Sequence, residues 1–282
     1  MFNLKSIHPS ILAFVILGIL FAVSFLLQGC SPRAQLLGDQ EYKNFNYARA
    51  IEHYEASLAK KNNNEVRLRL ANCYVQTNQA RKAEEHYRKL VSMSREDRLK
   101  FTRVLMINGK YAQARKVIRT NLRANPSDQD FQLLLAACDS LPVFLDKNPA
   151  FEVQLLPAPI NQQGSNFGAA YCANGIVFAS ERPTPGKKRE AGWTGEHFLD
   201  LHYAEQTDLG EWTQPVPLAG KVNSPYHEGV VAFFNNGKSM LFTRNNFYKG
   251  QKALDQHDVN HLQLFRADLT GGTWQSISGQ FP

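Results

Sequence analysis

A repeat of 31 to 33 residues constrains the fold of this chain more than any other feature. Ala83 follows Ala50 by 33 residues, and Ala114 follows Ala83 by 31. A bulky residue lies four positions after each alanine, and the first two of these are Tyr54 and Tyr87. Such a period is typical of stacked helical hairpins, in which each unit buries its apolar face against the next. The pattern therefore predicts an array of paired helices over residues 30–141.

The first helix of each of the first two predicted pairs also carries a small residue, at Gly38 and at Ala71. A small residue at a crossing lets two antiparallel helices approach closely. These residues resemble the tetratricopeptide pattern, and the resemblance implies a surface that binds protein partners and carries no chemistry of its own. An array that serves only as a spacer is the alternative. Residues 128–138 are expected to form a closing helix.

After Pro142 the helical spacing gives way to short β-rich runs that align at intervals of 61 to 64 residues. Gly168 aligns with Gly229, and Trp212 aligns with Trp274. Four strands with one late tryptophan in each unit are typical of a propeller blade. The predicted fold class is therefore multidomain, α then β, with tetratricopeptide helical repeats followed by two blades of an incomplete propeller.

The second β unit carries the sharper motif, which consists of Gly229, Gly237, Phe242 and Arg244. It resembles the WD40-like (PD40) β-propeller repeat, in which a turn of the Asp-Gly-Lys type joins two inner strands. Asn236-Gly237 is expected to form that turn as a two-residue hairpin, because both residues tolerate positive φ. A closed propeller takes about 4 to 8 blades. We therefore expect either that Pro282 marks a truncation or that another polypeptide completes the blades.

The start of the chain resembles a bacterial lipoprotein signal. Lys5 precedes an apolar run over residues 11–27, and Gly29 stands directly before Cys30. The resemblance implies cleavage between Gly29 and Cys30 and acylation of Cys30, which would anchor the protein in a membrane. An uncleaved membrane helix is the alternative, since the run is near the lower end of spanning length. The predicted organisation is a signal peptide (1–29), a repeat domain (30–141), a linker (142–150) and a partial propeller (151–282).

The net charge of +7 is concentrated in the helical half. Residues 31–141 contain 20 Lys and Arg against 12 Asp and Glu, whereas residues 142–282 contain 11 against 13. An exported, lipid-anchored protein rarely meets nucleic acid, so no nucleic-acid partner is expected. The excess favours an acidic protein partner or an anionic surface. A solvated helix surface rich in Lys and Arg is the alternative.

No combination of residues makes a convincing catalytic or metal site, and the protein is predicted not to be an enzyme. His257 and His261 are the best metal candidates, but their surroundings predict a loop and no zinc-protease motif encloses them. No cofactor is expected. Cys73 and Cys138 are expected to be buried thiols, and Glu84-Glu85 is assigned to a solvated helix face.

A lipoprotein signal, tetratricopeptide repeats and PD40 blades, in this order, resemble the start of a family of outer-membrane lipoproteins of Bacteroidota-type bacteria. Complete members continue into an OmpA-like domain that binds peptidoglycan, and PorE-like members belong to the type IX secretion system. The resemblance implies a non-enzymatic scaffold on the periplasmic face of the outer membrane, with envelope proteins as partners of the repeats. Peptidoglycan is expected as a partner only if a further C-terminal domain exists. The alternatives are a propeller-based hydrolase or glycan-binding module, and a truncated remnant of a longer OmpA-family protein.

Overall fold

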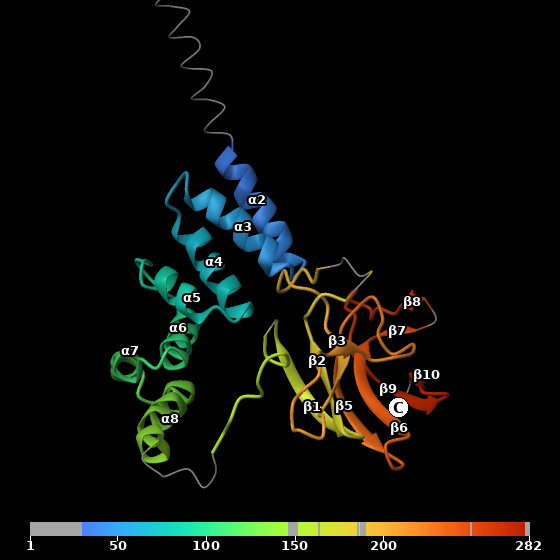
Figure 1. The fold of residues 1–282 in the computed structure, drawn as a ribbon. Coiled ribbons are helices and arrows are strands. Elements are labelled where there is room, and N and C mark those ends of the chain that lie inside the picture. The colour runs from blue at the N-terminus through green and yellow to red at the C-terminus, as the bar shows by residue number, and fades with distance from the viewer. Residues whose placement is uncertain are drawn as a thin grey trace, which may run out of the picture. The chain divides into compact units, whose positions relative to one another are not determined.

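A computed structural model of the chain describes residues 30–145, 152–162, 164–184, 186, 190–248 and 250–279 (Figure 1). The chain divides into two compact units. The helical unit comprises the described part of Met1–Pro149 together with Gly192–Gly195, and the β unit comprises the described parts of Ala150–Ala191 and Glu196–Pro282. The predicted signal peptide, including Gly29, lies outside the described residues.

The described part of the helical unit contains seven consecutive helices. They are α2 (Cys30–Lys43), α3 (Tyr47–Leu58), α4 (Asn64–Gln76), α5 (Ala80–Tyr87), α6 (Arg95–Ile107), α7 (Tyr111–Ala124) and α8 (Gln129–Leu145). Helix α8 continues four residues beyond Leu141, into the segment predicted to be a linker. Pro142 therefore lies within α8 and does not end it.

The turn inside each helix pair has the same geometry in all three repeats. The second residue after the first helix has a left-handed φ, which is 60° at Phe45, 59° at Asn78 and 73° at Gly109. The next N–H then donates to the carbonyl five positions earlier, over 2.8 to 2.9 Å (Asn46 to Glu41, Gln79 to Tyr74, Lys110 to Leu105). This Schellman arrangement satisfies carbonyls that a helix end leaves free. It reverses the chain after α2, α4 and α6.

Small residues at the crossings bring the helices of the repeats into close contact. The four predicted alanines are fully buried, at positions Ala50, Ala71, Ala83 and Ala114. In the first pair, a Cβ atom placed on Gly38 would lie 2.6 Å from Cε1 of Tyr54. The glycine therefore provides the space that the tyrosine ring occupies.

The repeat tyrosines are buried together with a hydrogen-bond partner. The Tyr54 hydroxyl donates to Asp39 at 2.7 Å, and the Tyr87 hydroxyl donates to Asn72 at 2.8 Å. Burial, with a smaller contribution from the Asp39 hydrogen bond, raises the pKa of Tyr54 far above its ordinary value, so the phenol remains a donor. The corresponding residue of the third repeat is Ile118, which is buried without a polar group.

The segment Gly192–Gly195 belongs to the compact helical unit although it is distant in sequence. Its Trp193 ring stacks on Phe45, with centroids 6.3 Å apart, and meets Tyr47 edge to face at 4.7 Å. The indole Nε1 donates to the backbone carbonyl of Gln76 at 2.8 Å. Left-handed φ is unusual for a bulky residue such as Phe45, and this aromatic packing offsets part of its backbone strain.

The β unit consists of two four-stranded antiparallel sheets and a small hairpin. The first sheet has the order β1-β2-β3-β4, with β1 (Asn166–Cys172), β2 (Gly175–Ser180), β3 (Asp200–Glu205) and β4 (Val216–Pro217). The second has the order β5-β6-β9-β10, with β5 (Glu228–Phe234), β6 (Ser239–Asn245), β9 (Leu262–Thr270) and β10 (Thr273–Gly279). The hairpin of β7 (Phe247–Tyr248) and β8 (Gln251–Lys252) lies in the β6–β9 connection. The described strands form open sheets, and no closed barrel or ring.

The two sheets share one apolar core. Val177 and Leu201 of the first sheet belong to the same buried cluster as Met240, Phe242 and Phe265 of the second. Backbone pairing also joins the sheets, because the chain after β4 runs parallel to β10 beside Trp274. The Trp274 N–H donates to the carbonyl of Ala219, and the N–H of Lys221 donates to the carbonyl of Trp274, each at 2.9 Å.

The two sheets also repeat each other in detail. The first strand of each sheet shifts register at the aligned glycine, Gly168 in β1 and Gly229 in β5. An arginine then packs over a phenylalanine of the second strand, Arg182 over Phe178 in one sheet and Arg244 over Phe242 in the other. Arg244 is 4% exposed, so this member of the blade motif is a buried packing residue.

The turn between β5 and β6 differs from the predicted two-residue hairpin. Phe234 pairs with Ser239, so four residues lie between the strands. Asn235, Asn236 and Gly237 all have left-handed φ, of 52°, 53° and 77°. The prediction was wrong because Asn235 also tolerates the left-handed region, and the dipeptide alone does not fix the register of the strands.

Replacing Gly38 with alanine tests the close crossing of α2 and α3. Helix propensity alone would stabilise the helix by about 1 kcal/mol, whereas overlap with the Tyr54 ring is expected to destabilise the unit by about 1 to 3 kcal/mol. Chemical denaturation followed by circular dichroism measures the difference. In a Tyr54→Leu background most of the penalty should disappear, and a gain of stability in Gly38→Ala alone would refute the crossing.

A second glycine pair tests the backbone contact with β10. A Cβ atom on Gly220 would lie 1.9 Å from the Trp274 carbonyl oxygen, whereas on Gly210 the nearest atom, at 4.0 Å, belongs to the flexible Gln206 side chain. Both glycines have positive φ, so backbone strain should lower the free energy of unfolding of both alanine variants by about 1 to 2 kcal/mol. Only Gly220→Ala should also accelerate amide hydrogen exchange over residues 262–279. Equal protection in the two variants would contradict this pairing.

Candidate functional site: a charged junction and a basic groove

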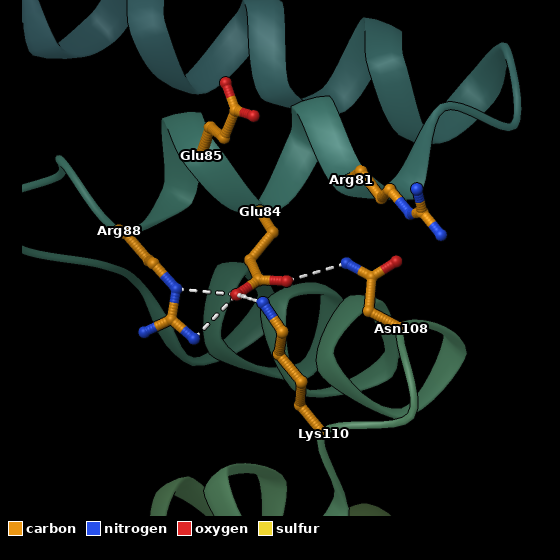
Figure 2. Close-up of a pocket in the computed structure, with 6 residues that line it drawn as sticks. All are labelled: Arg81, Glu84, Glu85, Arg88, Asn108 and Lys110. Carbon is orange, nitrogen blue, oxygen red and sulfur yellow. Dashed lines mark hydrogen bonds and ion pairs between the residues drawn. The ribbon is translucent and has the colours of Figure 1, made fainter.

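One polar pocket of the described helical unit lies where the second repeat meets the third (Figure 2). It has a volume of about 490 Å³. Its lining residues come from α5 and from the turn between α6 and α7, and they are Arg81, Glu84, Glu85, Arg88, Asn108 and Lys110. The residues are cations, carboxylates and one amide, so the site can hold polar groups, and its lining residues include no cysteine, serine or histidine.

Glu84 is the centre of this site, and its side chain is 5% exposed. The Arg88 guanidinium donates to Oε1 at 2.6 Å and Lys110 Nζ donates to the same oxygen at 2.7 Å. Asn108 donates to Oε2 at 2.7 Å and also to the backbone carbonyl of Ala80 at 3.1 Å. Figure 2 shows the carboxylate surrounded by these donors, while Glu85 points away from them. One buried carboxylate therefore joins α5 to the α6–α7 turn.

Two opposing effects set the protonation of Glu84. Burial penalises the charged form and by itself raises the pKa. Hydrogen bonds from Lys110, Arg88 and Asn108 together outweigh it and hold the pKa of Glu84 below its ordinary value. The carboxylate is therefore ionised at neutral pH, and it neutralises part of the charge of its two cationic partners.

Glu84 is predicted from the sequence to lie on a solvated helix face, and this prediction is wrong. Glu85 is exposed, as expected, but Glu84 is buried. Its cationic partner Lys110 is 26 residues away along the chain, so local patterning gave no indication of the contact. The one available signal was the position of Glu84 directly after Ala83, a buried repeat residue.

A second hollow, of about 430 Å³, lies along α7. We call it the α7 basic groove, and its lining residues are Ala112, Arg115, Lys116, Arg119, Thr120 and Arg123. Arg115 pairs with Asp139 at 2.9 Å. Residues 81–123 contain 13 Lys and Arg against 4 Asp and Glu, so the excess charge predicted for the helical half is concentrated around α5, α6 and α7.

The remaining candidate residues do not gather into a reactive site. Cys30 begins α2. Cys73 and Cys138 are buried free thiols, and burial raises the pKa of Cys73 to about 12. His257 and His261 lie outside the helices and strands, between β8 and β9. In the described residues no group of three or more His, Cys, Asp or Glu side chains could hold a metal ion.

A Glu84→Gln variant tests the junction. The amide keeps the shape but loses two charge-assisted hydrogen bonds, so the free energy of unfolding should fall by about 1 to 2 kcal/mol at neutral pH. Because the folded pKa is depressed, the advantage of Glu84 is present above the ordinary carboxyl pKa and is lost as the pH falls through the folded value. Denaturation of both proteins across that range measures the convergence. Glu85→Gln is the matched control and should change stability little; equal effects of the two changes would rule out the junction.

Comparison with known protein families identifies repeats in part of the helical unit. A family model described as "Tetratricopeptide repeat" matches residues 41–99. Similar solved structures include the Arabidopsis OM64 TPR domain (14% identity, TM-score 0.35, covering 41% of this chain and 98% of that chain). Others are the second TPR domain of human RPAP3 in complex with an HSP70 peptide (19%, 0.35, 40% and 98%) and the Sgt2 TPR domain from Aspergillus fumigatus (15%, 0.34, 46% and 91%). No curated protein sequence matches the chain.

Among the described residues, no helix has the length and apolar character needed to cross a membrane. The chain contains tetratricopeptide repeats, and the family match lies within residues 41–99.

Proposed function

We propose that this protein is a non-enzymatic, lipid-anchored scaffold of the bacterial envelope, in which the helical repeats bind a protein partner. One observation carries the proposal. The repeats use their apolar side chains in the stack, with Tyr54, Tyr87 and Ile118 all fully buried. What the α5–α7 region offers to other molecules is charge spaced along packed helices, which is suited to recognition of a partner and not to covalent chemistry.

We propose further that the β unit provides two blades of a PD40-type propeller. Three features support this assignment: both four-stranded sheets are antiparallel, both bulge at the aligned glycine, and both pack an arginine over the second-strand phenylalanine. Large apolar strand residues also remain exposed, including Tyr171 at 85% and Leu262 at 61%. Such residues are suited to packing against further blades.

The anchor and the location are proposed from the sequence. Gly29-Cys30 at the end of an apolar run is the layout of a lipoprotein signal. Acyl chains on Cys30 would hold the protein on the periplasmic face of the outer membrane. A type IX secretion complex or a peptidoglycan-associated complex is the setting that the family resemblance favours.

A Cys30→Ala variant tests the anchor. The wild type should fractionate with the outer membrane and carry a mass increment from acyl chains, and the variant should lose both. Fractionation of native cells followed by intact mass measurement gives both results. Cys172→Ala, which removes a half-buried thiol of the β unit, is the control and should stay membrane-bound. Membrane retention of Cys30→Ala with an unchanged mass would overturn the lipoprotein assignment.

A further inference from the structure

The α7 basic groove contains cations that no described carboxylate neutralises. Ala114 and Ile118 face the core, whereas Lys116, Arg119 and Arg123 are exposed. The ion pairs of the described residues include Arg115 with Asp139 but none to the other three cations of the groove. The groove therefore differs from the Glu84 junction, where a buried carboxylate forms ion pairs with the neighbouring cations.

This arrangement is unfavourable for the isolated helix. Arg115, Arg119 and Arg123 follow one another at intervals of four residues, so like charges lie on the same face of α7 and repel one another. Each such pair destabilises an isolated helix slightly, by about 0.2 to 0.5 kcal/mol. A local conflict of this kind is expected where a surface serves a purpose other than stability.

The spacing of the cations identifies the kind of anion that fits. Four residues of α-helix advance about 6 Å, and alternate residues of an extended peptide are roughly 6.6 Å apart. Guanidinium groups also match carboxylates through paired hydrogen bonds. A membrane surface fits less well, because α7 exposes no large apolar side chain for insertion among the acyl chains.

Resting on the scaffold function proposed above, we infer that the α7 basic groove binds an extended acidic segment of a protein partner, with carboxylates at alternate positions. Arg119 and Arg123 hold two successive carboxylates and Lys116 lies beside them. Asp139, paired with Arg115, places a negative charge at one end of the groove and limits the segment there.

The test measures binding of a short fluorescein-labelled peptide, in which Glu alternates with Thr, to the full-length protein in detergent. Arg119→Gln/Arg123→Gln should weaken binding by roughly tenfold or more at low salt, with α7 intact by circular dichroism because glutamine is a good helix former. Lys60→Gln/Lys61→Gln, which removes the same charge from an exposed segment after α3, should change affinity less than twofold.

Three outcomes would overturn the inference. They are equal weakening in both double variants, equal affinity for a peptide of the same composition with its Glu residues clustered, and displacement of the peptide by phosphatidylglycerol vesicles at lower concentration than by unlabelled peptide. Each leaves the anchored scaffold standing, since that proposal is tested by the Cys30→Ala fractionation. If the wild type did not associate with the membrane, the anchored-scaffold proposal would be refuted. The result of the peptide-binding assay would be unaffected.

Discussion

The close approach of paired helices at small residues is the constraint on which the helical unit depends. The Tyr54 ring occupies the space that a side chain at Gly38 would fill. The repeat alanines are fully buried. A larger residue at such a crossing would separate the helices and expose the tyrosine behind it. The left-handed turns at Phe45, Asn78 and Gly109 then return the chain at the same angle each time. Crossing and turn together explain why the sequence keeps a period near 33 residues.

The packing also determines where charge can lie. Because the apolar faces are used within the stack, Lys and Arg remain on the outer surfaces of α5, α6 and α7. Glu84 is a charged residue that does not remain on the outer surface. It is buried, and it pairs with Arg88 and Lys110 at the junction of two repeats. This contact fixes the turn before α7 and so helps to hold the α7 basic groove in one position. A helix held in place fixes the spacing of the cations along it, which lowers the entropy cost of binding a partner of matching spacing.

The sequence predicts the features that recur at short range. Three agreeing repeats predict the helix pairs and the small residues that lie at their crossings, and the family match over residues 41–99 confirms tetratricopeptide repeats. The two aligned β-rich units predict two four-stranded sheets, which the structure contains. Periodicity is informative in these cases because the same contacts are made repeatedly along the chain.

Features that depend on distant or single contacts could not be predicted. Glu84 and Glu85 are indistinguishable as a pair of carboxylates on a helix, and only the third repeat supplies the lysine and asparagine that bury Glu84. The β5–β6 turn was predicted too short because register is set by the pairing of Phe234 with Ser239 and not by the Asn-Gly dipeptide. Trp193, which packs on Phe45 and Tyr47, lies in a polar stretch with no repeat to indicate its role.

The most direct test of a lipid-anchored scaffold that binds through its repeats is site-specific photo-crosslinking in native membranes. A photoreactive amino acid at Thr120, which lines the α7 basic groove without contributing a charge, should yield a defined crosslinked envelope protein whose attached peptide is acidic. The same probe at Lys60, on an exposed segment after α3, should yield none. Crosslinks from Thr120 to phospholipid alone, or identical products from both positions, would contradict the account.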